Sequence, residues 1–155
     1  MHRPTIVEQF VDGLHDGERI VRARSGEVIL RETYRRGERH GTRTRWARDG
    51  TCVELATYVD GLVEGAHLHW YDDGTLQRVL TTVGGVVHGP VLFFDAYGEE
   101  VASGIYRDGE PWDGTFYRPN RSRAIRPAKL VTMSEGEVVD VRDIAVVTRR
   151  SETRP

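Results

Sequence analysis

The sequence predicts an all-β protein: an elongated, twisted antiparallel meander of about five 24-residue hairpin repeats, followed by a C-terminal hairpin. Three series of glycines, each spaced by 24 residues, carry this prediction. The series are Gly13, Gly37, Gly61, Gly85 and Gly109; Gly17, Gly41, Gly65 and Gly89; and Gly26, Gly50, Gly74 and Gly98. Because glycine interrupts the runs between them so often, long helices are excluded.

Composition predicts a cytoplasmic protein with a modest core. The 155 residues are 38% hydrophobic and carry a net charge of -2, which argues against broad attraction to nucleic acid or to anionic membranes. No stretch approaches the ~18 apolar residues of a membrane span, and the segment from Met1 to Phe10 lacks a signal-peptide core. The single cysteine, Cys52, excludes an intramolecular disulfide and a cysteine-based zinc cluster.

Each repeat is predicted to contain two strands with a turn after each. In the second repeat the strands are expected within residues 27–36 and 42–48. Asp49-Gly50 and Asp73-Gly74 predict type I′ turns, in which both central residues have positive φ. The Gly-x-x-x-Gly connections predict the other reversal, since their glycines can adopt left-handed conformations. The repeat sheet is expected over residues 5–117.

The C-terminal part of the chain departs from this pattern. Residues 118–129 contain arginines, a lysine and two prolines without an acidic residue, and they predict a basic loop. Residues 130–147 predict a capping hairpin around Ser134-Glu135-Gly136, which pairs with the last repeat or folds back across the sheet. Residues 148–155 predict a flexible tail.

Aromatic side chains recur at equivalent positions of successive repeats. One column contains Phe10, Tyr34, Tyr58 and Tyr106, with Thr82 as the exception, and a second contains Trp46, Trp70 and Phe94. These columns are expected to pack across the sheet. His40 and His88 each precede a glycine of the second series, so we expect their imidazoles to bond backbone groups of a turn.

Two segments resemble the MORN repeat, specifically its bacterial variant. They are Tyr34-Arg35-Arg36-Gly37-Glu38-Arg39-His40-Gly41 and Tyr58-Val59-Asp60-Gly61-Leu62-Val63-Glu64-Gly65, each followed by a tryptophan and an Asp-Gly pair. The resemblance covers residues 5–117 and implies a single-layer sheet of hairpins. MORN arrays serve as interaction platforms, lipid-proximal scaffolds or accessory domains beside enzymes, and bacterial stand-alone members are often labelled antitoxins.

His67 and His69 form the sharpest candidate site, because residues two apart on a strand project from one face. The equivalent positions hold Arg43 and Arg45 one repeat earlier, and Val91 and Phe93 one repeat later. This pattern predicts a cationic patch beside an apolar patch, suited to a small anionic or aromatic ligand. The predicted binding residues are Arg43, Arg45, Trp46, His67, His69, Trp70 and Phe93. The alternative is an ordinary solvated face, and no metal site is expected.

We therefore expect a non-enzymatic module that binds a protein partner through a curved repeat sheet, antitoxin-like or immunity-like, without a cofactor. No recognised catalytic motif is present, so no catalytic residue is assigned. The alternative is a small stand-alone biosynthetic enzyme, a cofactor-independent cyclase or isomerase, in which His67 and His69 act as acid and base within a pocket. A homodimer is a further expectation, because a one-layer ribbon leaves apolar surface exposed.

Overall fold

The computed structural model describes residues 3–118 and 128–144. These residues form a single antiparallel sheet of 13 strands in which β1 and β13 are the edges, and this confirms the predicted fold class. The strands are β1 (Thr5–Val11), β2 (Leu14–Arg22), β3 (Val28–Arg35), β4 (Glu38–Trp46), β5 (Cys52–Val59), β6 (Leu62–Val63), β7 (Gly65–Trp70), β8 (Leu76–Val83), β9 (Val86–Phe94), β10 (Glu100–Arg107), β11 (Glu110–Arg118), β12 (Ala128–Ser134) and β13 (Glu137–Ile144).

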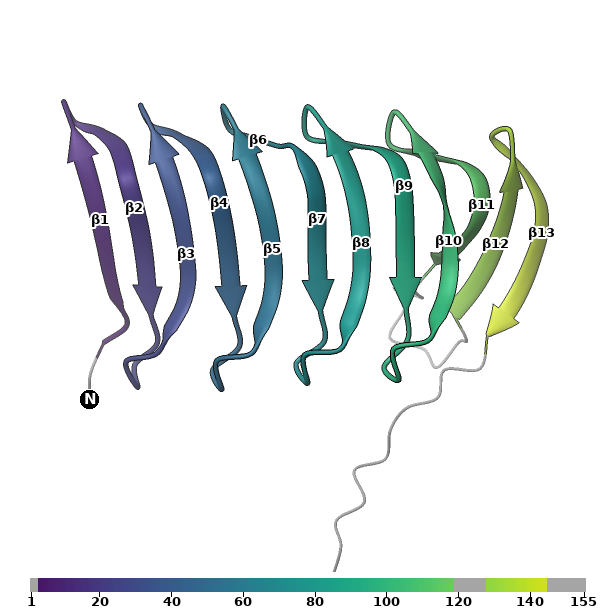
Figure 1. Cartoon of the computed structure of the whole chain (residues 1–155), viewed down its shortest axis with the longest axis horizontal. Coiled ribbons are helices and arrows are strands. Elements are labelled where there is room, and N and C mark those ends of the chain that lie inside the picture. The colour runs from purple at the N-terminus through teal and green to yellow at the C-terminus, as the bar shows by residue number, and fades with distance from the viewer. Residues whose placement is uncertain (1–2, 119–127, 145–155) are drawn as a thin grey trace, which may run out of the picture.

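The strands follow one another in chain order, and the reversals alternate between an upper and a lower edge (Figure 1). The short β6 pairs with β5 beside the main path, and Glu64 separates it from β7. None of the described residues belongs to a helix long and apolar enough to cross a bilayer.

Two-residue turns form the upper edge. The first residue of each turn has a φ between 46° and 57°, and the second is a glycine with positive φ, which defines the type I′ turn. The first residues are Asp12, Arg36, Asp60, Gly84, Asp108 and Glu135. This turn matches the right-handed twist of the strands, so the first glycine series is explained by strand reversal.

Three-residue turns form the lower edge, and here the predicted type I′ turns at Asp49-Gly50 and Asp73-Gly74 are wrong. Of these residues only the glycines have positive φ, 90° at Gly50 and 85° at Gly74. The Gly50 amide donates to the Ala47 carbonyl at 3.1 Å, and the Ala47 amide donates to the Thr51 carbonyl at 2.8 Å. This is a type I turn followed by one left-handed glycine, the usual three-residue hairpin loop.

The second glycine series lies inside strands rather than in the reversals. Gly41 has a φ of 102° and lies opposite Tyr58, at an irregularity where residues 40–42 of β4 oppose Thr33 of β3. A Cβ at Gly41 would lie 3.1 Å from the Thr33 hydroxyl. The glycine therefore permits a local bulge that a residue with a side chain would strain.

The upper turns are also tied to the preceding repeat by side chains. His40 Nδ1 accepts from the Asp60 amide at 3.4 Å, and His88 Nδ1 accepts from the Asp108 amide at 3.3 Å. This confirms the predicted role of both histidines. At the equivalent positions Asp16 accepts from the Arg36 amide and Glu64 accepts from the Gly84 amide. The position needs an acceptor, and imidazole and carboxylate both supply one.

The first aromatic column packs through intervening side chains. The His15 ring lies between Phe10 and Tyr34, with centroid distances of 4.2 and 4.8 Å. The Arg39 guanidinium lies 5.9 Å from the Tyr34 ring centroid and 5.7 Å from that of Tyr58. From Phe10 to Tyr58 the aromatic rings of the column therefore alternate with the His15 imidazole and the Arg39 guanidinium, which lie on the intervening strands.

The C-terminal hairpin pairs with the last repeat, as predicted, because β12 pairs with β11 and then with β13. A cluster of buried apolar side chains forms at this end, and its members are Val91, Phe116, Val131 and Met133. Gly104 faces Gly114 here, and the Phe116 ring occupies the space that a Cβ at Gly104 would need. The central part of the predicted basic loop and the whole predicted tail lie outside the described residues.

Candidate functional site

One face of the sheet carries His67 and His69, and we call it the ionic face. Cross-strand partners share a face, so the register identifies its other members. Across one row Arg19 faces Glu32 and Glu32 faces Arg43. Across the neighbouring row the order is Arg45, Glu54, His69, Arg78 and Phe93. Acidic and basic side chains therefore alternate as far as Glu54, and the two basic residues His69 and Arg78 follow before Phe93.

Glu32 anchors the first half of the ionic face. Its side chain is 1% exposed, and its carboxylate accepts from Arg19 at 2.6 Å, from Arg39 at 2.9 Å and from the Tyr34 hydroxyl at 3.1 Å. Arg43 Nε lies 3.4 Å away. Burial raises the pKa of Glu32, but the hydrogen bonds from Arg19 and Arg39 outweigh burial and hold the pKa below its ordinary value.

Glu54 anchors the second half. Arg43 and His67 meet its Oε1 at 2.6 and 3.1 Å, and Arg45 donates to its Oε2 at 3.0 Å. Burial alone would raise the pKa of this carboxyl, but hydrogen bonds from Arg43 and His67 help to lower it from 4.5 to about 2. The Glu54 carboxylate is therefore ionised at neutral pH and fully engaged by its neighbours.

His69 and Arg78 end the ionic face toward the apolar cluster. Burial, followed by the charges of Arg78 and His67, lowers the pKa of His69 from 6.5 to about 4. The imidazole is thus neutral at pH 7, and its Nε2 can accept from Arg78, which lies 3.4 Å away. The His67 and His69 rings lie 4.3 Å apart between centroids.

The structure brings some of the predicted binding residues together and separates others. Arg43, Arg45, His67 and His69 meet around Glu54, and Phe93 lies opposite Arg78. The two tryptophans end β4 and β7 beside the lower turns, where Trp46 faces Cys52 and Trp70 faces Leu76. Within the described part of the chain, neither indole makes a hydrogen bond or ring contact with the two histidines.

The predicted cationic patch changes character in the structure. Arg43 and Arg45 are paired with carboxylates, so their charges are largely neutralised on the sheet. Glu32, Glu54 and Arg78 were not among the predicted site residues. Comparing positions 24 residues apart compares every second strand, and these three residues lie on the strands between. The available signal was that Glu32 and Glu54 carry the opposite charge to the neighbouring arginines, once the strand register is known.

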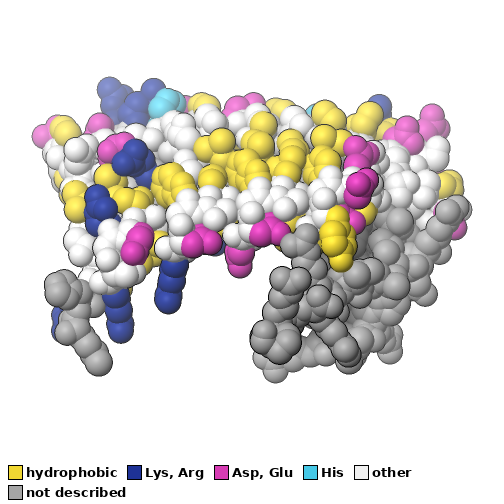
Figure 2. Space-filling model, turned by 60° about the horizontal axis from the view of Figure 1, so that its bottom comes forward, with side chains coloured by type: hydrophobic (Ala, Val, Ile, Leu, Met, Phe, Trp, Pro, Cys, Tyr) yellow, Lys and Arg dark blue, Asp and Glu magenta, His cyan; other side chains and the backbone are white. Residues whose placement is uncertain are grey.

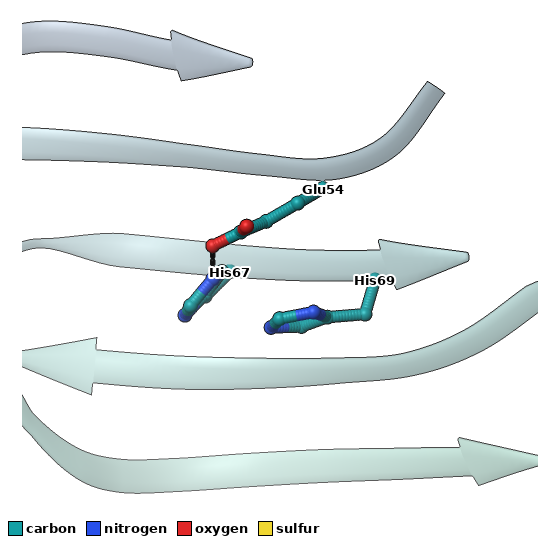
Figure 3. A group of neighbouring side chains, drawn as sticks. All are labelled: Glu54, His67 and His69. Atoms are coloured by element: carbon teal, nitrogen blue, oxygen red, sulfur yellow. Dashed lines mark hydrogen bonds and ion pairs between the residues drawn. The ribbon is translucent and has the colours of Figure 1, made fainter. Parts of the chain in front are cut away.

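Glu54, His67 and His69 have the composition of a metal site, and their ligand atoms lie within 4.8 Å of one another (Figure 3). Their neighbours oppose a divalent cation, however. Two unit charges 4 Å apart interact by about 4 kcal/mol near a protein surface, and Arg43, Arg45 and the His69-bound Arg78 all contribute positive charge. The expectation that no metal binds therefore stays a prediction, and the electrostatics favour it.

The opposite face of the sheet carries an apolar row that we call the aliphatic row. Its members are adjacent cross-strand partners on β5, β7, β8 and β9, namely Leu55, Leu68, Val79 and Leu92. All four are half-buried although no second layer of described residues covers them. Figure 2 shows this face, with hydrophobic side chains gathered in a band along the sheet and acidic side chains along the border of the lower turns.

Two open hollows lie along the upper turns of the described residues, away from His67 and His69. Arg35, Arg36, Glu38 and Asp60 line the first hollow. Val83, Val86, His88 and Asp108 line the second. Neither hollow reaches His67 or His69.

No protein-family model matches this chain, and a search of curated proteins finds no match to it.

Proposed function

We propose that this chain is a MORN-type repeat protein that binds a protein partner through its aliphatic row and carries no enzymatic activity of its own. The hairpin meander and the spacing of 24 residues support the MORN assignment. The observation that carries the binding function is the unbroken contact of Leu55, Leu68, Val79 and Leu92 across four neighbouring strands of an open face.

The border of the row indicates the chemistry of the partner. The lower turns beside it carry exposed carboxylates at Asp49, Asp72 and Asp73. A partner segment with apolar side chains flanked by lysine or arginine would bury the row and pair with these carboxylates. Inhibition of a toxin by such a contact would be the antitoxin-like form of this function.

The enzyme hypothesis is not carried forward. The two hollows described above give it no support, because they lie along the upper turns. His67 is hydrogen-bonded to Glu54, whose carboxylate is also held by two arginines. These contacts support a structural role for His67 in the ionic face.

Affinity purification from the native host tests the proposal. The full chain is compared with the double variant Leu55→Thr/Leu68→Thr, which places strand-favouring threonines at both positions but removes the aliphatic surface. We expect the wild-type chain to retain a stoichiometric protein partner, and the purified partner to bind the double variant at least about tenfold more weakly.

A matched control lies on the ionic face. Val21 and Leu30 are also half-buried cross-strand partners, so Val21→Thr/Leu30→Thr likewise replaces two aliphatic side chains by threonine on the other side of the sheet. This control should bind like the wild type, and circular dichroism should show that both double variants keep the sheet. Equal binding by the two double variants, or recovery of no stoichiometric protein, would contradict the proposal.

A further inference from the structure

Arg78 differs from the other arginines of the ionic face because it has no carboxylate partner in the described part of the chain. Arg19, Arg39, Arg43 and Arg45 each pair with Glu32 or Glu54. Among the described residues no acidic side chain pairs with Arg78, and its buried Nε has no hydrogen-bond partner. A buried donor without an acceptor is destabilising, so the electrostatic and hydrogen-bonding needs of this guanidinium are not met by the described residues.

The one neighbour that Arg78 does contact cannot balance its charge. His69 Nε2 lies 3.4 Å from Arg78 Nη2, at the long end of the range for a hydrogen bond, and the imidazole is neutral at pH 7. Glu54 is separated from Arg78 by β7 and is already held by Arg43 and Arg45. The guanidinium thus has no counter-charge among the described residues, and its planar fork of donors matches the geometry of a carboxylate.

The side chains beyond Arg78 are apolar and belong to the C-terminal cluster. Phe93 faces Arg78 across β8 and β9, and Leu80 follows Arg78 by two residues on the same face. Both pack against the buried cluster that contains Val91 and Phe116. A carboxylate on an apolar chain or ring can pair with the guanidinium while its apolar part lies on these side chains, and inorganic phosphate has no apolar part to do so.

We propose that Arg78 and His69, together with Leu80 and Phe93, form a site for the carboxylate of an amphiphilic organic acid. The carboxylate accepts from the Arg78 guanidinium, and the apolar part of the acid lies toward the C-terminal cluster. The site is on the face opposite the aliphatic row, so it is independent of the proposed protein-binding surface.

Nuclear magnetic resonance of the full chain with labelled histidines tests the site, with octanoate as the probe. Octanoate should shift the His69 ring resonances in a saturable way and should raise the pKa of His69, because a bound carboxylate stabilises the imidazolium. Acetate lacks the apolar chain and should bind at least about tenfold more weakly. Inorganic phosphate should give no saturable shift.

Two variants of Arg78 separate binding from folding. Arg78→Met should weaken octanoate binding at least about tenfold, and Arg78→Lys should also weaken it because an ammonium lacks the planar fork. The control Arg31→Met removes an exposed arginine whose nearest carboxylate, on Glu18, lies 3.9 Å away, and it should bind octanoate like the wild type. The thermal midpoint of Arg78→Met without probe should equal or exceed that of the wild type, because a half-buried cation whose Nε lacks a partner has been removed.

Three results would overturn this assignment. The first is octanoate binding of equal affinity to the wild type and to Arg78→Met. The second is the absence of any saturable His69 shift with octanoate in the folded wild-type chain. The third is saturation of His67 and His69 by Zn²⁺ at micromolar concentration without a response to octanoate, which would make the cluster a metal site.

Discussion

Glu32 shows how a single residue organises the ionic face. Its carboxylate lies on β3 between strands that supply Arg19 from one side and Arg39 and Arg43 from the other. Because its side chain is 1% exposed, its charge depends on these partners for solvation. Removing the carboxylate would leave several guanidiniums close together without a counter-charge.

Glu32→Gln should therefore destabilise the protein strongly. Breaking a buried ion pair typically costs about 3–5 kcal/mol, and the partial exposure of Arg19 and Arg39 places the expected loss near the lower end of that range. Urea unfolding at pH 7 measures it. The matched control is Glu18→Gln, where the carboxylate is half exposed and lies 3.9 Å from Arg31; it should change the free energy of unfolding by less than about 0.5 kcal/mol. Equal losses in the two variants would refute the role assigned to Glu32.

His69 makes the stability of the sheet dependent on pH. The pKa of its imidazole is about 4 in the folded protein, below the ordinary 6.5. Between these two values the unfolded chain binds a proton that the folded protein does not, so acidification favours unfolding. The free energy of unfolding should fall by about 1–2 kcal/mol between pH 7 and pH 4.5, once the full shift is reduced for partial solvent exposure.

The variant His69→Gln isolates this effect, because glutamine can accept from Arg78 without titrating. Its free energy of unfolding should vary less than that of the wild type between pH 6.5 and pH 4. Glu54 affects stability at lower pH, because its pKa is lowered to about 2 in the folded protein. Its contribution to the free energy of unfolding is present above pH 4.5 and is lost as the pH falls toward 2. If the free energy of unfolding of His69→Gln changed with pH above 4.5 as steeply as that of the wild type, another group would be the cause of the pH dependence.

At the scale of the elements, the two edge strands differ in how they are protected. β1, with the sequence TIVEQFV, contains one charged residue, Glu8, and Ile6, Val7 and Phe10 are all more than half exposed. β13, with the sequence EVVDVRDI, contains four charged residues. Charges on an edge discourage pairing with another chain, and β1 lacks this protection.

We therefore expect self-association to occur through β1, in accordance with the expected homodimer. Two copies of β1 pairing antiparallel would give a closed two-fold dimer. Val7→Lys should shift sedimentation profiles toward the monomer by introducing a charge on the edge. The matched control Val139→Lys places the same change on β13, where Val139 is 60% exposed, and it should leave the profile unchanged. A wild-type chain that remains monomeric at millimolar concentration would contradict this expectation.

At the scale of the whole molecule, the described residues concentrate their buried apolar cluster at one end of a long sheet. Val91, Phe116, Val131 and Met133 pack where β9 to β12 meet, whereas the buried core of β3 includes the carboxylate of Glu32. Repeat arrays are stabilised chiefly by contacts between neighbouring repeats. Regions far apart along this sheet should consequently open with different free energies.

Phe116→Ala tests this separation. Phe116 is 1% exposed, and its truncation should cost about 3–5 kcal/mol locally. Hydrogen exchange should show protection lost in β9 to β12 while β3 to β5 keep wild-type protection. Phe10→Ala, at a position that is 54% exposed, serves as the control and should leave β9 to β12 protected. Uniform loss of protection along the chain would instead indicate a single cooperative unit.

The fold was predictable because its signals are local. Glycines at Gly13 and Gly37 mark turns that only a left-handed residue can close, and their spacing gives the length of a repeat without knowledge of any contact. The roles of His40 and His88 were predictable for the same reason, since equivalent positions in a repeat have equivalent neighbours. The lower turns were mispredicted because Asp-Gly is compatible with two hairpin geometries.

The candidate site was predictable only in part, because it depends on strand register. His67 and His69 share a face by simple alternation, and this held in the structure. Which residue of β5 faces Arg45 depends on the turn and on any bulge beside it. If the residues of β4 and β5 are paired by counting outward from the turn between them, Trp46 faces Cys52, as observed. The same count would pair Arg45 with Val53. A one-residue irregularity pairs Arg45 with Glu54 instead.

The sequence by itself determined the repeat length, the positions of the reversals and the antiparallel order of the strands, because each follows from backbone preferences within a few residues. Only the tertiary structure decided that Glu54 joins the arginines and histidines and that Arg78 is left without an acidic partner among the described residues. The physical reason is that a shift of one residue moves a whole strand's side chains to the other face, and local preferences do not fix where that shift occurs.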